Sequence, residues 1–330
     1  MGSLTWGIIA AIPLALSSTT GQTQGDTPPP AAVAVATTAA PLTLTEVIAL
    51  ETERYRRLTV PVTIMGQGPY RFMIDTGAQA TVLSRDLADQ LQLFDRAPAT
   101  LVAMASTRQV ETTMVEQVAL GSRVFTIQMA PLLDAVNIGG ADGILGLDSL
   151  QNQRVLFDFE NNLLSVADAE TLGGNRGFDI VVRARRQLGQ LIIHRARIDG
   201  VSVAVIIDTG AQGSVGNPVL AQRLRRARQQ ADTTMTDVHG VEITGQTRIA
   251  QRLELGRAEI GNFPIVFADS PTFINLGLGD EPAMVLGMAE LRLFRRVAID
   301  FASQQVLFDM PSTAGTLDRF NFTNQATRID

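Results

Sequence analysis

The sequence contains no cysteine and no lysine, and these two absences remove several kinds of chemistry. Without cysteine the chain has no disulfides, no thiol nucleophile and no thiolate metal ligands. All 27 basic residues are arginine, so Schiff-base chemistry and the lysine of a phosphate-binding loop are also excluded. Only His194 and His239 carry an imidazole, so a Ser–His–Asp enzyme would have to use one of them. Carboxylates remain as the main reactive groups.

The charge balance argues against nucleic acid as a partner. The formal net charge is −6 and the sequence pI is near 5.1, so the chain has no basic field to attract phosphates. A length of 330 residues with 45% hydrophobic residues is enough for two domains, or one large one, with sizeable cores. We therefore expect a globular protein that needs no cofactor, metal or nucleic acid.

The first 42 residues carry signals of export. The run from Trp6 to Leu16 is apolar but too short to span a bilayer, and small residues follow it, although no basic residue precedes it. We predict a signal peptide at 1–17, with a short buried helix as the alternative. Residues 18–42 are rich in Thr, Ala and Pro and predict a disordered spacer. The expected location is periplasmic or secreted; whether the apolar stretch is cleaved or tethers the protein to a membrane is left open.

The rest of the chain contains one pattern twice. Residues 73–79 read MIDTGAQ and residues 206–212 read IIDTGAQ, and each copy ends an apolar strand that follows a strand and a turn. Ser84 and Asn217 then suit the N-caps of short helices at 85–93 and 218–226. Later segments recur in the same order, among them ILG (144–146) and VLG (285–287). The recurrence predicts two homologous lobes.

The polar, Gly-rich segment between the copies predicts where the lobes divide. We place the first lobe at 43–168, a linker at 169–176 and the second lobe at 177–311. Short β-branched segments with frequent turns predict that each lobe is a mostly antiparallel β domain carrying two short helices. In the tail, 312–330, Phe320 and Phe322 alternate as in a last edge strand, but fraying is an equal alternative.

The doubled turn suggests a specific chemistry. An aspartate at the end of an apolar strand sits at the edge of a core, and a glycine two residues later permits a close backbone approach. If the lobes pair about a two-fold axis, Asp75 and Asp208 meet. Two carboxylates a few ångströms apart cannot both ionise, so they share a proton, and one acts as a base while the other acts as an acid.

These residues resemble the retropepsin-like aspartic proteases, with the pepsin-like enzymes as bilobal relatives. The resemblance covers most of residues 55–310, and the tandem arrangement is similar to that of exported bacterial proteases of this type. It implies a mostly β fold of two retropepsin-like β-barrel lobes in one chain, and hydrolysis of peptide bonds. The catalytic dyad would be Asp75 and Asp208, and the supporting residues would be Thr76, Gly77, Ala78, Thr209, Gly210 and Ala211.

Two details of the turns bear on how such a site would work. Ala78 and Ala211 match the retroviral pattern rather than that of pepsin, which has a hydroxyl there, so we expect the dyad to titrate higher and to favour mildly acidic to neutral pH. Gln79 and Gln212 depart from the family pattern, which puts substrate main-chain contacts at that position in doubt.

The resemblance places flaps at 101–117 and 235–251. Only the second segment has glycines, Gly240 and Gly245, so we expect either that the second lobe supplies the main lid or that the lids differ. His239 and Gly240 are candidate substrate contacts, with an exposed turn as the alternative. His194 is expected to be structural. Asp158 and Asp300 also recur, and we interpret them as turn or salt-bridge residues.

The leading interpretation is therefore a monomeric aspartic endopeptidase acting on a polypeptide substrate. One alternative is a non-hydrolytic peptide-binding protein that keeps the cleft but not the activity. Another is a regulatory protein whose activity is confined to one partner. Intact Asp-Thr-Gly turns in both copies favour the enzyme.

Overall fold

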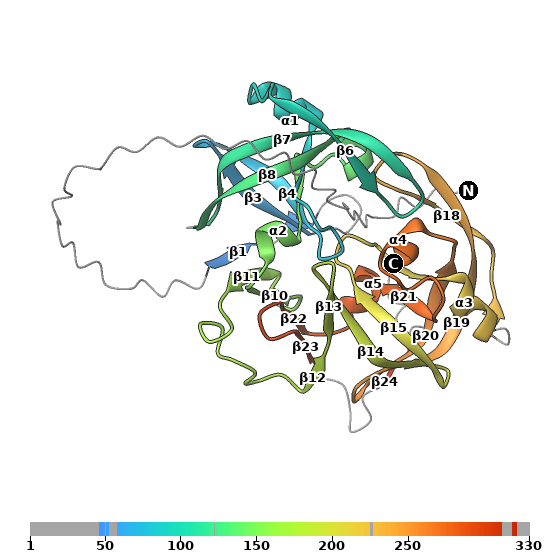
Figure 1. Ribbon diagram of the computed structural model, residues 1–330. Helices are drawn as coiled ribbons and strands as arrows, with labels where there is room; N and C mark the ends of the chain where they lie inside the picture. The colour runs from blue at the N-terminus through green and yellow to red at the C-terminus, as the bar shows by residue number, and fades with distance from the viewer. Residues whose placement is uncertain are drawn as a thin grey trace, which may run out of the picture.

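The computed structural model describes residues 46–49, 51–52, 58–121, 123–224, 227–311 and 319–321. The predicted signal peptide (1–17) and spacer (18–42) lie outside these residues. Three β-sheets dominate the described chain, so the prediction of a mostly β fold is confirmed. Two of the sheets form the lobes, and the third joins them (Figure 1).

The first lobe is an eight-stranded sheet that closes into a barrel where β3 also pairs with β7. Its strands, in spatial order, are β2 (Glu51–Thr52), β3 (Leu58–Ile64), β4 (Gln67–Ile74), β9 (Gly143–Leu145), β5 (Val82–Ser84), β8 (Arg123–Leu133), β7 (Thr107–Leu120) and β6 (Arg96–Val102).

Strand β4 shows why the sequence pattern leads to this barrel. Tyr70, Phe72 and Ile74 alternate into the main hydrophobic core, while Met73 packs on the opposite face in a second buried cluster. The strand pairs in parallel with β9, and the Asp75 N–H donates to the carbonyl of Leu145 at 3.0 Å. Asp75 is therefore held in position at the end of a strand whose two faces are both buried.

The second lobe repeats this plan, and pairing of β14 with β19 closes it. Its main path runs through β13 (Arg185–Gln187), β14 (Gln190–Ile198), β15 (Val201–Ile207), β21 (Ala283–Leu286), β16 (Ser214–Gly216), β20 (Ala258–Phe267), β19 (Glu242–Leu255) and β17 (Arg228–Gln229). Two further strands join it, β18 (Thr233–Thr236) beside β19 and β24 (Arg319–Asn321) beside β20. The edge strand expected in the tail is thus present at 319–321, whereas Phe322 lies outside the described residues.

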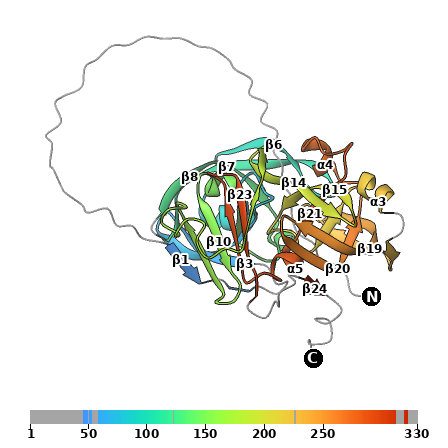
Figure 2. The same ribbon diagram turned by 90° about the horizontal axis from the view of Figure 1, so that it is seen from below.

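The third sheet, here called the base sheet, takes strands from both halves of the chain (Figures 1 and 2). Its order is β1 (Glu46–Ala49), β11 (Leu163–Ala167), β10 (Arg154–Asp158), β22 (Arg296–Asp300), β23 (Gln305–Asp309) and β12 (Ile180–Arg183). The seam between the halves is the antiparallel pair β10–β22. Across it Arg154 and Asp300, both buried, form an ion pair at 2.7 Å.

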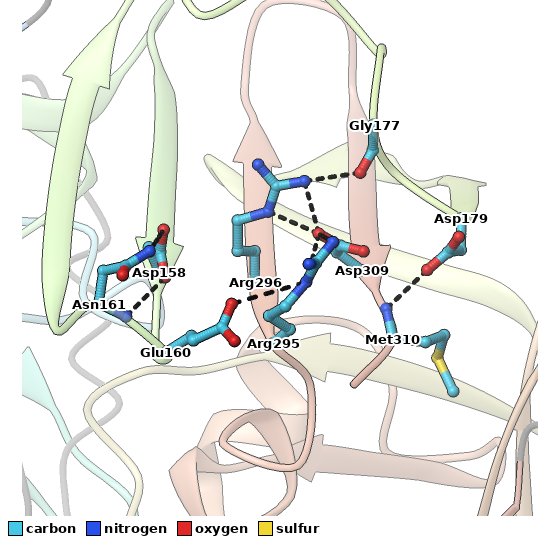
Figure 3. A network of polar contacts seen from close by, with 9 residues as sticks. All are labelled: Asp158, Glu160, Asn161, Gly177, Asp179, Arg295, Arg296, Asp309 and Met310. Carbon is cyan, nitrogen blue, oxygen red and sulfur yellow. Dashed lines mark hydrogen bonds and ion pairs between the residues drawn. The ribbon is translucent and has the colours of Figure 1, made fainter. Parts of the chain in front are cut away.

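A second ion-pair cluster covers the base sheet near its end. Figure 3 shows the guanidinium groups of Arg295 and Arg296 converging on the buried carboxylate of Asp309, at 2.7 and 2.5 Å. Arg295 also reaches Glu160 of the first half at 4.0 Å. Asp158, in contrast, accepts hydrogen bonds from its own turn, at Asn161. The turn or salt-bridge roles expected for Asp158 and Asp300 are therefore confirmed.

The helices are short: α1 (Arg85–Gln90), α2 (Leu147–Leu150), α3 (Pro218–Arg223), α4 (Pro271–Asn275) and α5 (Met288–Leu291), with a 3₁₀ turn η1 (Ala135–Ile138). Ser84 and Asn217 cap α1 and α3 as predicted, accepting from N–H groups three residues later. Both helices end earlier than expected. None of the helices in the described ranges is long and apolar enough to cross a membrane.

The prediction of two helices per lobe is wrong for the second lobe, which has three within its described residues. The extra helix α4 forms where the first lobe has only the 3₁₀ turn η1. The Ser270 hydroxyl accepts from the Thr272 N–H and Pro271 takes the first helical position, whereas Asp134 makes no side-chain cap before η1.

Candidate active site

The two Asp-Thr-Gly turns meet between the lobes. Asp75 follows β4 and Asp208 follows β15, and both side chains are fully buried. Oδ1 of Asp75 accepts from the N–H groups of Gly77 and Ala78 at 2.8 and 2.9 Å. Oδ1 of Asp208 accepts from the equivalent pair in its own turn at 2.8 and 3.2 Å. Each turn thus holds one oxygen of its own carboxylate.

The threonines lock the two turns together. The Thr76 hydroxyl donates to the Ile207 carbonyl at 3.0 Å and accepts from the Thr209 N–H at 3.2 Å. The Thr209 hydroxyl makes the reciprocal bonds, to the Ile74 carbonyl at 2.9 Å and from the Thr76 N–H at 3.1 Å. All four bonds cross from one lobe to the other. The resemblance placed both threonines among the supporting residues.

Close contact between the carboxylates and the opposite turns requires the two glycines. A Cβ at Gly77 would lie 2.5 Å from Cγ of Asp208, and a Cβ at Gly210 would lie 2.2 Å from Oδ2 of Asp75. Real Cβ atoms do not approach other atoms so closely, so no other residue fits here without displacing a carboxylate.

The carboxylates titrate as a pair. Burial raises the pKa of Asp208 well above its usual range, and the charge of Asp75 and a hydrogen bond to it raise that pKa further. The Gly210 and Ala211 N–H groups act in the opposite direction. The arrangement therefore favours a state with one proton shared between the two carboxyl groups.

Comparison with known families agrees with this geometry. Residues 60–152 match the family described as "gag-polyprotein putative aspartyl protease", and residues 194–289 match the family described as "Aspartyl protease". The chain carries two aspartyl protease domains in tandem. A search of curated proteins finds no match.

The layer beneath the turns differs between the two protease domains. In the first, the Thr81 hydroxyl lies 2.6 Å from both Asp148 and Ser149 and accepts from the Gly146 N–H at 3.0 Å. In the second, Ser214 donates to a fully buried glutamate, Glu290, at 2.7 Å. Burial raises the pKa of Glu290 to about 7. Burial also raises the pKa of Asp148, although hydrogen bonds from Thr81 and Ser149 oppose that shift.

Gln190 is a site residue that the sequence analysis missed. It begins β14 of the second domain, is fully buried, and donates from Nε2 to the Gly77 carbonyl of the first domain. Its Oε1 is buried and has no hydrogen-bond partner among the described residues. No motif marked it, because the contact joins residues 113 positions apart.

The flaps are the β6–β7 and β18–β19 hairpins, one from each domain (Figure 1). Their tips each insert an apolar side chain into a cluster of the opposite domain. Met104 packs in the cluster that contains Ala211, and Val238 packs in the one that contains Ala78. Both domains therefore supply a hairpin whose tip packs against the other domain.

Gly245 was wrongly assigned to a mobile tip. It lies within β19 opposite Thr233, and a Cβ there would come 2.6 Å from the Phe267 carbonyl oxygen. The glycine reflects close strand packing rather than mobility. Gly240 does lie at the tip, with φ of +72°, and packs against Asn137 of the other domain. His194 lies in β14, as expected for a structural residue.

His239, the other predicted contact, is a nearly buried residue and not an exposed turn. Its Nδ1 lies 2.7 Å from Oγ of Ser106, which in turn lies 2.6 Å from Oδ2 of Asp237. This is not the order of a Ser–His–Asp triad, because the carboxylate accepts its short hydrogen bond from the serine, while Nδ1 of the imidazole lies 3.9 Å from it. Within the described chain, no group of three or more His, Asp or Glu is arranged to hold a metal.

Proposed function

We propose that the protein is an aspartic endopeptidase in which Asp75 and Asp208 form the catalytic dyad. The observation that carries this proposal is the pairing of two buried carboxylates by reciprocal threonine bonds between the domains, with the Asp208 pKa raised. Such a pair holds one proton over the pH range in which a lone carboxyl group would have lost it.

The chemistry follows from that single proton. Asp75, as carboxylate, takes a proton from a water molecule while the water oxygen bonds to the carbonyl carbon of the scissile peptide. Asp208 gives its proton to the carbonyl oxygen, forming a neutral tetrahedral diol. Asp75 then protonates the amide nitrogen, the C–N bond breaks, and Asp208 recovers a proton from a diol hydroxyl. The products are a carboxylic acid and an amine, and the dyad returns to its starting state.

We further propose that one chain makes one complete site in the periplasm or outside the cell. The shared base sheet and the four threonine bonds support a single-chain site, because each half contributes one aspartate. A linker keeps the effective concentration of the second half high at any dilution. The apolar N-terminal run supports the location.

The test is an assay of the purified protein against a peptide library, with and without pepstatin. We expect cleavage of extended peptides with apolar side chains beside the cut, inhibition by pepstatin and indifference to EDTA. Asp75→Asn is the control for a contaminating protease. If the protein binds library peptides but cleaves none of them at any pH from 3 to 8, it is a peptide-binding protein instead.

A further inference from the structure

The carboxylate of Asp237 lies between the two flap tips and accepts hydrogen bonds from both. Its Oδ1 accepts from the N–H groups of His239 and Val241 in its own hairpin, at 2.9 and 3.0 Å. Its Oδ2 accepts from the Ser106 hydroxyl at 2.6 Å and the Ala105 N–H at 3.3 Å, both in the flap of the first domain. Four donors therefore surround a carboxylate that is 2% exposed.

The surroundings of His239 indicate which atom donates in its hydrogen bond with Ser106. Burial lowers the pKa of His239, as does the charge of Arg108, while Asp237 opposes the shift, so a neutral imidazole is favoured. Ser106 has one proton, and the short distance to the carboxylate places that proton toward Asp237. Nδ1 of His239 then donates to the Ser106 oxygen. The result is a chain of two bonds that ends on Asp237.

Other contacts hold the same tips in place. The Ser270 hydroxyl donates to the Met104 carbonyl at 2.6 Å, and the Thr272 hydroxyl donates to the Ala103 carbonyl at 3.3 Å. The side chains of Met104 and Val238 are each buried in the opposite domain. The second domain thus binds the tip of the first flap through two hydrogen bonds to its carbonyl groups and through the buried Met104 side chain.

We propose that Asp237 is a positioning residue that ties the two flap tips into one roof over the dyad, so that the flaps close together rather than independently. The second flap supplies the acceptor and the first flap supplies donors, so the roof is asymmetric although the domains are homologous. The role in substrate binding rests on the proposed protease function. The tie itself does not, and it can be measured without any activity.

The absence of cysteine makes a distance measurement straightforward. Nitroxide labels on Gln109→Cys and Glu242→Cys, both at exposed flap positions, report the separation of the hairpins by pulsed EPR. We expect one narrow distance distribution in the otherwise unchanged protein, and a broader distribution with a longer component in Asp237→Asn and in Ser106→Ala. In the double variant the change should not exceed that of Asp237→Asn, because both substitutions remove the same link.

The matched control is Asp199→Asn. Asp199, in the turn between β14 and β15, also accepts backbone N–H groups of β19, from Gln251 and Arg252, but among the described residues it has no hydrogen bond to the first flap. We expect its distribution to match that of the unchanged protein. If Asp237→Asn and Asp199→Asn give the same distribution, the tie does not exist and the proposal is overturned, whatever the activity.

Kinetics then test the role of the tie in substrate binding. With a peptide that the protein cleaves, we expect Asp237→Asn to raise KM about tenfold, as for loss of a hydrogen bond to a charged group, with kcat within about threefold. Ser106→Thr, which keeps the hydroxyl, should restore most of what Ser106→Ala loses. A fall in kcat at constant KM would overturn the positioning role, while failure to find any cleaved peptide would count against the protease function alone.

Discussion

The two domains present the same Asp-Thr-Gly turn on different supports. Beneath the first turn, the Thr81 hydroxyl hydrogen-bonds with Asp148 and Ser149, whereas beneath the second the Ser214 hydroxyl donates to Glu290. Ala289 follows Gly287 by two residues, as Asp148 follows Gly146, so it occupies the equivalent place, and its methyl side chain cannot accept a hydrogen bond there. The turns must match because they meet at one site, whereas the residues beneath them face only their own core. The difference suggests where the copies are free to diverge.

The strongest test of equivalence is the dyad itself. We expect Asp75→Asn and Asp208→Asn each to lower kcat/KM by about 10³-fold or more, because the reaction needs one ionised and one protonated carboxyl. The double variant should be no worse than either. Circular dichroism checks the fold, and mixing the two single variants should restore nothing. Substantial recovery on mixing would mean that lobes pair between chains.

The threonine bonds should be equally important in both domains. Thr76→Val removes the hydrogen bonds of the Ile207 carbonyl and the Thr209 N–H. Thr209→Val removes those of the Ile74 carbonyl and the Thr76 N–H. Since each buried group without a partner costs about 1–3 kcal/mol, we expect each variant to lose about 2–5 kcal/mol of unfolding free energy in urea titrations. Thr76→Ser, which keeps the hydroxyl, is the control. A loss in only one domain would contradict the reciprocal arrangement.

The buried carboxyl groups beneath the two turns should differ in their response to substitution by an amide. The pKa of Glu290 is about 7 in the folded protein against 4.5 in the reference state. The folded state therefore binds that proton more tightly, and its stabilising effect is complete below pH 4.5 and lost as the pH rises through 7. Glu290→Gln removes this loss, so its stability relative to the natural chain should rise by about 3 kcal/mol between pH 4.5 and pH 8.

Asp148→Asn is the comparison for that variant. Asp148 accepts from both the N–H and the hydroxyl of Thr81, and an amide there replaces an acceptor oxygen with a donor. We expect a loss of about 1–2 kcal/mol at neutral pH. Thermal melts at pH 4.5 and pH 8 measure both variants. A Glu290→Gln stability difference that does not change with pH would show that Glu290 titrates normally.

The smallest expected effect concerns Gln190, which supports the first turn from the second domain. Gln190→Met removes the bond to the Gly77 carbonyl while keeping the side-chain length, and we expect kcat/KM to fall tenfold or less, as for about one neutral hydrogen bond. Gln187→Met is the control, because Gln187 also donates to a carbonyl, that of Leu276, within its own domain. Equal effects on activity would mean that Gln190 is merely structural.

The parts of this molecule that local pattern governs could be predicted from the sequence. Alternating apolar residues and a turn predict a strand pair wherever they occur, and Ser84 and Asn217 cap helices through bonds to residues three positions away. The meeting of Asp75 and Asp208 could be inferred only because the motif occurs twice. Because the motif is repeated, a contact between two residues far apart in the sequence could be predicted.

The residues that sequence reasoning missed act through unrepeated, distant contacts. Gln190 reaches Gly77, and Asp237 reaches Ser106, but nothing in the local pattern around either residue differs from an ordinary strand start or hairpin turn. Gly245 misled for a related reason, since a glycine in sequence does not reveal whether it permits motion or close packing. Contacts that occur in one copy of the repeat and not in the other could be identified only from the structure.

The order of strands in the base sheet has a practical consequence. Strands β1, β11 and β10 from the first half lie on one side of a single seam, and β22, β23 and β12 from the second half lie on the other. Opening the chain within the linker at 169–176 would therefore leave each half with its own barrel, its share of the sheet and one aspartate of the pair. Two such fragments, each inert by itself, would form a split reporter whose proteolytic signal appears only when fused partners bring the halves together.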